Sequence, residues 1–453
     1  MNLNQWLDAI QALHPAEIDL GLERLRVVAQ RLGLGRPAPL VITVAGTNGK
    51  GSTVAMLETI FRAAGYRVGT YTSPHILVFN ERVHIAGAMA SDEALCEAFE
   101  RIVAARQDVP LTYFEYTTLA GLLLLEEAAL DVAILEVGLG GRLDAVNLID
   151  ADIAVITSIG LDHQDWLGDT RELIGREKAG IMRPARPAVC GDLQMPESIA
   201  EEAARLGVPL YRQGQEFGYT VVEDEAASPT WDWWGADGAG GERRVAGLPL
   251  PELDVINAAT VLQVLALQPL PVPDAALATG LAGLSLPGRF QRVQDPRHVF
   301  ELRMDVAHNP HAAVMLASKL AARKKLRILN GEAGQGGLVR AVVAMMADKD
   351  HAGYHAALES EVDIWYIAAF DQPRCQHAGQ LLALMQQAGA HTRGPFDDVT
   401  QAYEAAWRDA GGDDLILVTG SFVTVADVLQ DIDAHRQHSQ GAHFQSQDSQ
   451  SQD

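Results

Sequence analysis

Short runs of apolar residues alternate with helical patterns along the first part of the chain. PLVITVA (39–45) predicts a buried strand, residues 52–64 predict a helix and residues 67–73 predict another strand, which together make a βαβ unit. VAILEVG (132–138) and IAVITS (153–158) predict two further parallel strands that are buried on both faces. Helices are also expected at 117–130, 171–182 and 252–267.

A second group of apolar runs lies in the last third of the chain. Residues 339–346, 363–370 and 415–420 predict strands with helices between them, and PGRFQRV (287–293) predicts a linker in front of them. The chain is also too long for one typical core, so more than one domain is expected. We predict an α/β fold with a mostly parallel N-terminal domain at 1–287, a smaller Rossmann-like C-terminal domain at 288–436 and a disordered tail at 437–453.

Three segments break these patterns. Residues 211–247 are rich in Gly, Trp and acidic side chains, and WDWWGADGAGGERR (231–244) predicts a surface hairpin or loop. LNGEAGQGGLVR (329–340) predicts a flexible loop. The Ser/Gln/Asp-rich end of the chain, HSQGAHFQSQDSQSQD, predicts the disorder assigned to the tail.

Composition narrows the classes of protein that fit the chain. It has 453 residues, 48% of them hydrophobic, and a formal net charge of −24. We expect no binding to nucleic acid, which needs a basic face, although a local group of Lys and Arg can still hold phosphates. We expect no secretory signal, because MNLNQWLDAI has no basic segment followed by an apolar run, and no apolar run is long enough to span a membrane. The three widely spaced cysteines suggest neither a disulfide framework nor a metal cluster, so we expect a cytoplasmic protein.

The sequence VAGTNGKGST (44–53) follows the first predicted strand and resembles a phosphate-binding loop. It departs from the usual motif because Gly51 stands between Lys50 and Ser52. Its glycines let backbone N–H groups converge in front of a helix that we expect to start near Ser52. Lys50 can reach the β- and γ-phosphates, and a hydroxyl at position 52 or 53 can bind Mg²⁺. A glycine-rich turn with a capping serine is the alternative, but it gives Lys50 no purpose. We therefore interpret the N-terminal domain as a P-loop-type nucleotide-binding domain.

Three polar residues of the same domain are further candidates. Glu136 ends an apolar strand, where P-loop enzymes hold a metal, although an edge carboxylate paired with a cation fits as well. His163 lies just past a strand in SIGLDHQDWLG (158–168), as a metal ligand, a proton carrier or an ordinary loop histidine. Lys178 shares no helical face with Glu177, and its spacing favours a surface lysine.

The second half of the chain holds weaker candidates. In DVAHNPHA (305–312), Asp305 stands at a strand end where it can hold ribose hydroxyls, with His308 nearby; an Asn-Pro turn into a helix explains the same segment. Arg289 in PGRF can clamp a phosphate or form a linker salt bridge. ADKD (347–350) resembles the guanine-reading motif of GTPases, but Ala347 stands where that motif has Asn.

Taken together, these motifs resemble those of the folylpolyglutamate synthases of the Mur ligase superfamily. IDLGLER (18–24) and LTYFEYTT (111–118) resemble the bacterial bifunctional form, which is also a dihydrofolate synthase. The other segments that carry the resemblance, within about residues 15–430, are VAGTNGKGST, YTSPH (71–75), EVGLGGRLDAVN (136–147), TSIGLDHQDWLG (157–168), REKAGI (176–181), PGRFQ (287–291), DVAHNP (305–310) and ADKD (347–350).

The resemblance implies an ATP-dependent amide ligase that uses an acyl-phosphate intermediate. It would join L-glutamate to 7,8-dihydropteroate and to the glutamate tail of reduced folates. ATP would be bound by Gly46, Thr47, Asn48, Gly49, Lys50, Gly51, Ser52, Asn257, Arg289 and Asp305. Two Mg²⁺ ions would be bound by Ser73, Glu136 and His163. The expected catalytic residues are Lys50, Lys178 and His308, with Lys178 carbamylated so that it resembles a carboxylate. Asp19, Phe114 and Glu115 would line the pteroate pocket, and Ser421 would help to bind glutamate.

Three alternative functions stay open on the sequence alone. A folylpolyglutamate synthase without dihydrofolate synthase activity would carry nearly the same motifs. A nucleotide-switched regulatory protein would need a base-reading Asn-Lys-x-Asp motif, which ADKD does not supply. A metallohydrolase built on Glu136 and His163 would have no use for Lys50. We expect a monomer whose partners are small molecules, with no nucleic acid and no membrane.

Overall fold

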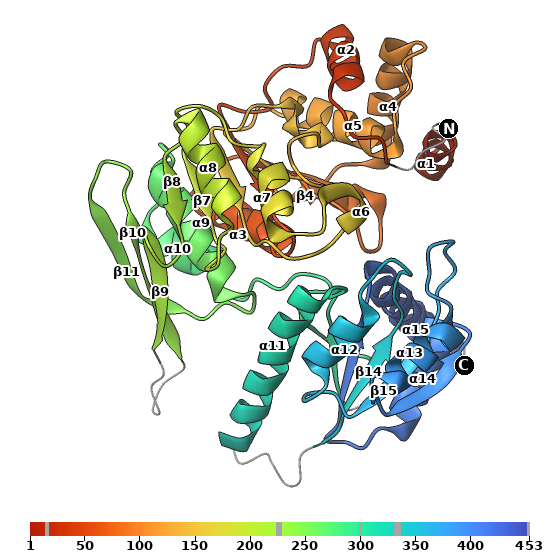
Figure 1. Ribbon diagram of the computed structural model, residues 1–453. Coiled ribbons are helices and arrows are strands. Elements are labelled where there is room, and N and C mark those ends of the chain that lie inside the picture. Colours follow the sequence, from red (N-terminus) through yellow and green to blue (C-terminus); the bar gives the residue numbers. More distant parts are fainter. Residues whose placement is uncertain (14–17, 223–228, 299, 330–336, 451–453) are drawn as a thin grey trace. The chain divides into compact units, whose positions relative to one another are not determined.

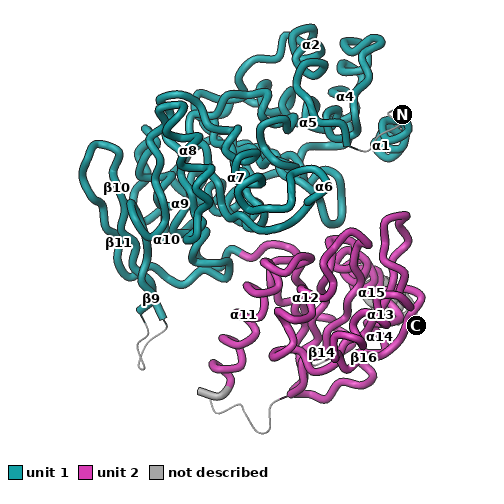
Figure 2. Tube along the Cα trace, in the orientation of Figure 1, with its two compact units in different colours: residues 1–284 teal, residues 285–453 magenta. Residues whose placement is uncertain are grey.

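The chain forms two compact units in a computed structural model that describes residues 1–13, 18–222, 229–298, 300–329 and 337–450, with only the backbone at 328–329 and 438–450. The units are Met1–Leu284 and Ser285–Asp453, coloured separately in Figure 2. The sequence predicts a domain boundary close to this division, at 287/288. Most of the predicted loop 329–340 lies outside the described residues. No described helix is both long and apolar enough to cross a membrane.

An eight-stranded sheet forms the centre of the first unit (Figure 1). Its order is β4-β3-β2-β5-β1-β6-β7-β8, and the strands from β2 to β8 run parallel to their neighbours. β1 and β5 are buried along their whole lengths, as expected for parallel strands covered on both faces. The strands are β1 (Leu40–Ala45), β2 (Val68–Tyr71), β3 (Val83–Ile85), β4 (Ala88–Met89), β5 (Val132–Glu136), β6 (Ile153–Ile156), β7 (Ala188–Cys190) and β8 (Leu210–Arg212).

Helices pack around this sheet, and α5 is the most deeply buried of them. It starts earlier than predicted because Thr112 and Glu115 form a capping box at its N-terminus. The helices of the unit are α1 (Leu3–Gln11), α2 (Glu23–Leu32), α3 (Lys50–Ala63), α4 (Asp92–Arg106), α5 (Tyr113–Glu127), α6 (Gln164–Leu167), α7 (Arg171–Ala179), α8 (Glu197–Leu206), α9 (Val255–Leu267) and α10 (Asp274–Leu281), with short 3₁₀ turns η1 (Phe79–Arg82) and η2 (Ala145–Leu148).

The tryptophan-rich segment belongs to the core of the first unit. It forms β10 (Thr230–Ala236), the middle strand of an antiparallel sheet with β9 (Phe217–Val222) and β11 (Glu242–Pro249). Burial alternates along β10, and the side chains of Trp231 and Trp233 are almost fully buried. The predicted hairpin at 231–244 is correct, but the predicted surface position is wrong. The burial alternates because β10 places one face on the core. In the sequence, this period of two is visible as the alternation of polar and aromatic residues in TWDW (230–233), which the prediction did not use.

The second unit contains a six-stranded sheet of order β12-β13-β17-β14-β15-β16 (Figure 1). The strands from β13 to β16 run parallel to their neighbours, and β12 is antiparallel at one edge. Its elements are β12 (Gln291–Val293), β13 (Glu301–Met304), α11 (Pro310–Leu329), β14 (Val339–Val343), α12 (His351–Leu358), β15 (Ile364–Ala368), α13 (Ala378–Gln387), β16 (Thr392–Phe396), α14 (Val399–Asp409), β17 (Leu415–Thr419) and α15 (Phe422–Gln450).

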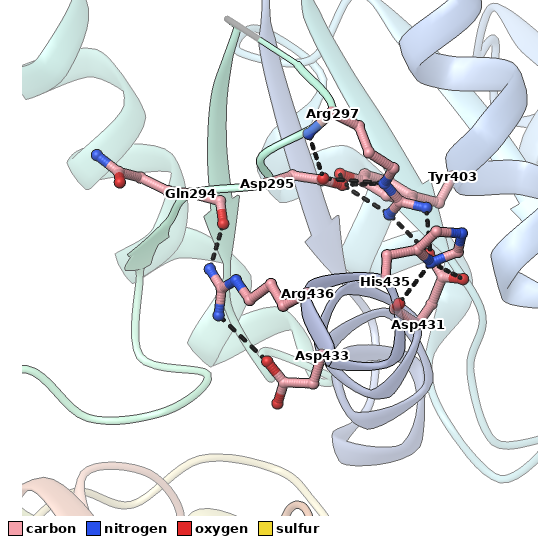
Figure 3. Close-up of polar contacts among 8 residues, drawn as sticks. All are labelled: Gln294, Asp295, Arg297, Tyr403, Asp431, Asp433, His435 and Arg436. Atoms are coloured by element: carbon pink, nitrogen blue, oxygen red, sulfur yellow. Dashed lines mark hydrogen bonds and ion pairs between the residues drawn. The ribbon is translucent and has the colours of Figure 1, made fainter. Parts of the chain in front are cut away.

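Polar contacts fix the last helix to the loop that follows β12 (Figure 3). The guanidinium of Arg297 donates to Asp295 and to Asp431 of α15, at 2.7 Å in each case. Arg436 of the same helix donates to the carbonyl oxygen of Gln294. The middle of α15, around Asp431 and Arg436, is therefore held in place by side chains as well as by packing.

The backbone of α15 continues through most of the predicted disordered tail. It is helical to Gln450, whereas composition predicts disorder from residue 437. The segment 437–450 has no proline and only one glycine, Gly441, so its residues tolerate a helical backbone although their side chains are polar. Composition measures the capacity to form a core and says little about a helix that continues from a packed one.

Candidate active site

The glycine-rich loop connects β1 to α3 and places the start of that helix beside it. The helix begins at Lys50, two residues before the predicted start near Ser52, and Gly49 takes the N-cap position with a left-handed φ of 87°. A Cβ at Gly46 would lie 1.8 Å from Oγ1 of Thr157. Glycine is therefore required at 46 because a side chain would collide with Thr157, and at 49 because of the left-handed backbone. The result is an open backbone in front of a helix N-terminus, which favours phosphate.

The residues after β6 hold this loop in place. The hydroxyl of Thr157 donates to the carbonyl oxygen of Asn48 at 2.7 Å, and Ser158 Oγ accepts from Asn48 N at 3.1 Å. Thr47 N donates to the carbonyl oxygen of Ser158 at 2.7 Å. The loop is therefore fixed by the neighbouring parallel strand before any ligand binds.

Two lysines meet at one carbonyl oxygen of the loop. Lys50 Nζ donates to Gly46 O at 3.1 Å, and Lys178 Nζ donates to the same oxygen at 3.0 Å. Lys178 is only 4% exposed, so the surface position favoured by its spacing is wrong. Burial, and next the charge of Lys50, lower the pKa of Lys178 to about 7. Near neutral pH, a substantial fraction of this amine is uncharged.

Helix α9 lies against the same loop. The amide of Asn257 is buried, and a Cβ at Gly49 would lie 2.7 Å from its Oδ1. Its Nδ2 is buried without a hydrogen-bond partner among the described residues. An orphaned amide beside a glycine loop fits a polar ligand such as a nucleotide.

A cavity of about 820 Å³ opens entirely within the first unit. Its wall brings together Asp19, Phe114 and Glu115, which were predicted to bind the pteroate, with Ser73 and His163, which were predicted to bind metal. The other lining residues are Leu7, Gln11, Ile18, Leu20, Gly21, Pro74, His75, Arg82, Thr112, Tyr113, Gly138, Leu139, Leu143, Asp144 and Ala145.

The predicted metal ligands lie at the ends of neighbouring strands. Glu136 ends β5 and is buried, and its Oε2 accepts from the backbone N of Ser73 at 3.3 Å. His163 precedes α6 in a left-handed conformation, with a φ of 50°. The described residues contain no group of three His, Cys, Asp or Glu side chains arranged to hold a metal. A metal here would therefore need other ligands, such as the Ser73 hydroxyl.

Glu115 and Asp19 are joined by an arginine on α2. Arg24 Nε lies 2.9 Å from Oε1 of Glu115, and Arg24 Nη1 lies 2.7 Å from Oδ2 of Asp19. Glu115 also accepts from Thr112 N at 2.8 Å, in the capping box of α5. Both predicted substrate residues do line the cavity, but the carboxylate of Glu115 has a structural role as well.

Asp144 is a cavity residue that sequence reasoning missed. It is buried at the N-cap of η2 and accepts from Leu139 N at 2.8 Å and from Val146 N at 2.9 Å. Burial raises its pKa to about 6 despite those amides. Its position in GLGGRLD, a glycine-rich turn after a buried strand, was the available signal.

His75 and Arg82 were also missed. Arg82 Nε donates to Nδ1 of His75 at 2.9 Å, and burial, followed by the charge of Arg82, lowers the pKa of His75 to about 4. His75 stands inside the YTSPH motif, whereas no spacing marks Arg82.

The predicted residues of the second unit gather at the ends of the parallel strands β13 and β17. Asp305 is buried and accepts from Phe290 N and Ala307 N, both at 2.9 Å. The ring of Phe422 lies 5.5 Å from the Arg289 guanidinium and 6.1 Å from the His308 ring. These side chains form one edge of that unit.

Ser421, which was predicted to help bind glutamate, lies at the same edge and is buried. Its hydroxyl is buried, accepts from Thr424 N at 2.9 Å and lies 2.7 Å from Oγ1 of Thr424. The side chain therefore caps the first turn of α15, which is a structural role.

Comparisons with known proteins match both units. The Mur ligase middle domain matches residues 44–224, and the glutamate ligase domain of Mur ligases matches residues 288–422. The dihydrofolate synthase/folylpolyglutamate synthase of Escherichia coli (strain K12) is 48% identical over 435 residues, 96% of each chain. The structure of E. coli FolC in complex with DHPP and ADP is 47% identical, with a TM-score of 0.87, and covers 96% of this chain and 99% of that chain. A bifunctional folylpolyglutamate synthase/dihydrofolate synthase with Mn, AMPPNP and L-glutamate bound is 47% identical, with a TM-score of 0.84, and covers 96% of this chain and 98% of that chain.

The likeness extends over nearly the whole chain and includes the loop, the cavity wall and the second sheet. It confirms the predicted α/β fold class, the predicted family and the class of ATP-dependent ligase. A regulatory switch and a metallohydrolase are no longer needed to explain the motifs. The chain belongs to the dihydrofolate synthase/folylpolyglutamate synthase family of Mur ligases.

Proposed function

We propose that this chain catalyses both reactions of its family, the addition of L-glutamate to 7,8-dihydropteroate and to the glutamate tail of reduced folates. The observation that carries the proposal is the position of the glycine loop relative to the cavity. Lys178 donates to the carbonyl oxygen of Gly46 in the loop, and a Cβ at Gly141, which lies between the cavity residues Leu139 and Leu143, would be 3.1 Å from Cα of Lys178. The loop and the cavity wall are therefore connected through one helix of the first unit.

The chemistry requires this proximity. A carboxylate is a poor electrophile because its oxygen is a poor leaving group, so its oxygen first attacks the γ-phosphorus of ATP and ADP leaves. The glutamate amine then attacks the acyl carbon, loses a proton and expels inorganic phosphate as the amide forms. Both steps concentrate negative charge, which must be neutralised by fixed donors and cations.

The loop residues would bind the phosphates of ATP. A backbone without Cβ atoms at 46 and 49 fits close phosphate contact, and Lys50 would exchange the carbonyl oxygens it now contacts for phosphate oxygens. Asn257 would place its orphaned amide on the nucleotide. Asp305 would hold the ribose, with Arg289 on the phosphates.

A divalent metal fits the residues around Glu136. The buried carboxylate beside Ser73 offers oxygen ligands suited to Mg²⁺, and the imidazole of His163 suits Mn²⁺ as well. When bound, the metal neutralises charge between the carboxylate and the triphosphate. We propose that two Mg²⁺ ions act here and that Lys178 is carbamylated. Its lowered pKa supplies the neutral amine that reacts with CO₂.

The cavity would hold the pteroate ring system. The ring of Phe114 lies against Gly138, where an added Cβ would be 2.4 Å from the ring. Asp144 and Asp19 offer carboxyl groups to the polar edge of a pterin.

In the second unit, His308 and Ser421 would act on the phosphates and the incoming glutamate. We further propose a cytoplasmic monomer, which light scattering and cell fractionation would test.

A steady-state assay tests the proposal. Purified protein with ATP, Mg²⁺ and L-glutamate should release ADP with dihydropteroate, and separately with tetrahydrofolate, and mass spectrometry should find each product one glutamate heavier. Activity on tetrahydrofolate alone would support the single-function alternative. Activity on neither acid would refute the proposed function.

A further inference from the structure

Arg82 is a buried cation on the wall of the cavity. It ends η1 and is 7% exposed. Its guanidinium lies 5.4 Å from the ring of Phe79 and 5.8 Å from the ring of Tyr113, and its Nε donates to Nδ1 of His75. Aromatic faces and a neutral histidine nitrogen therefore surround the charge.

No carboxylate pairs with Arg82 in the part of the chain that the structure describes. The neighbouring Glu81 carboxylate accepts from three backbone amides, at 2.7 to 2.8 Å. On the cavity wall, Asp19 and Glu115 are paired with Arg24, and Asp144 accepts from backbone amides. Burial of a charge without a counter-ion is costly, and such a group is retained where a ligand supplies the opposite charge.

The position of Arg82 identifies which part of a ligand it would meet. Its carbonyl oxygen accepts from Thr72 N at 2.9 Å, so its backbone lies beside Ser73, and Ser73 N in turn contacts Glu136. The Nε of Arg82 contacts His75, two residues after Ser73, and all three residues line the cavity, so the guanidinium lies on the part of the wall near the proposed metal site. Under the proposed function, an anion bound at this place would be the one that reacts with the γ-phosphate.

We propose that Arg82 binds the carboxylate of the acid substrate and holds it for attack on ATP. This inference rests on the proposed function. A guanidinium can form two parallel hydrogen bonds to a carboxylate, which fixes the orientation of both oxygens. The aromatic rings beside it exclude water and strengthen the pairing.

The inference is tested by removing the charge of Arg82, the charge of the ligand, or both, and by comparing the four affinities. The ligands are dihydropteroate and its analogue with hydrogen in place of the carboxylate, and binding is measured by calorimetry in the full chain with ADP and Mg²⁺. The proteins are the wild type, Arg82→Gln, Arg82→Lys and a control, Arg101→Gln, at an exposed arginine of α4.

The wild type and the control should bind dihydropteroate about 10- to 100-fold more tightly than the analogue without the carboxylate. This ratio is the range expected for a charge-assisted hydrogen bond. Arg82→Gln should reduce this preference below about threefold with little change for the analogue, and Arg82→Lys should keep part of it. The affinity for ADP should not change.

Three results would overturn the inference. A preference that persists in Arg82→Gln would exclude an interaction with the carboxylate. Equal weakening of both ligands would assign Arg82 a structural role, and weakening of ADP would assign it to the nucleotide. In each case the wild type would still turn over dihydropteroate, so the proposed function would stand. A wild type that neither binds nor turns over dihydropteroate would overturn both.

Discussion

The buried carboxyl of Asp144 predicts an unusual dependence of stability on pH. Burial raises its pKa from 3.8 to about 6, although backbone amides oppose the shift. Between these values the folded protein retains a proton that the unfolded chain releases, so the free energy of unfolding falls as the pH rises through this window. The loss is complete about one pH unit above the folded-state pKa of about 6. A shift of about two pKa units corresponds to about 3 kcal/mol.

The substitution Asp144→Asn removes this titration while keeping the shape of the side chain. One of the two N–H groups that now donate to it, Leu139 N or Val146 N, would face the amide nitrogen and lose its acceptor. That costs about 1–3 kcal/mol at every pH. The pH-dependent part is separate, because only the wild type titrates. Relative to the wild type, the variant should gain about 2 kcal/mol between pH 4.5 and pH 8.

Thermal unfolding of the ligand-free protein measures the effect. The difference in Tm between Asp144→Asn and the wild type should change by roughly 4–8 °C between pH 4.5 and pH 8, with the variant relatively more stable at the higher pH. Asp108→Asn, at an exposed aspartate, is the matched control and should show no such trend. A difference in Tm that stays constant across this range would refute the raised pKa of Asp144.

The remaining predictions concern the loop, the buried lysine and the tryptophan core. Gly46→Ala should weaken ADP binding at least about tenfold by calorimetry, because the new Cβ would collide with Thr157; unchanged affinity would contradict the close contact. Lys178→Ala should abolish turnover and keep much of the nucleotide binding, whereas Lys324→Ala, at an exposed lysine, should stay active. Near-normal turnover of Lys178→Ala would count against the carbamate, which ¹³C NMR with labelled bicarbonate can detect directly. Trp233→Ala should lower the free energy of unfolding in urea by about 3–5 kcal/mol, and a loss under 1 kcal/mol would contradict its burial.

The regular elements were predictable because their signals are local. β1, β5 and β6 are continuous apolar runs, and glycine, turn and helix follow in the order that a βαβ unit requires. The burial of the Trp-rich strand was missed because glycines and acidic residues on both sides suggested a segment on the surface. Its burial depends on contact with α9, which lies later in the sequence.

The candidate site shows the same division between local and distant information. Lys50 is recognisable from its own loop. Lys178 contacts the carbonyl oxygen of Gly46, 132 residues earlier in the chain, so its burial could not be predicted from the residues of its own helix. Arg82 carries no motif, and only the fold shows that no acid pairs with it in the described residues. Glu115 and Ser421 were predicted as ligand contacts, and the structure adds capping roles for both. The role of Glu115 follows the Thr-x-x-Glu pattern of a capping box at residues 112–115, which the prediction did not use.

The support behind the glycine loop has a practical consequence for labelling the protein. Trp233 of β10 donates to the carbonyl oxygen of Ala259 at 3.1 Å, and the same helix presents Asn257 to the loop. Changes within that strand should therefore alter nucleotide affinity from a distance. The turn at 237–241, just after the strand, differs because it is exposed and closed by its own hydrogen bonds. An affinity tag or fluorophore inserted in this turn should therefore leave the ligase intact.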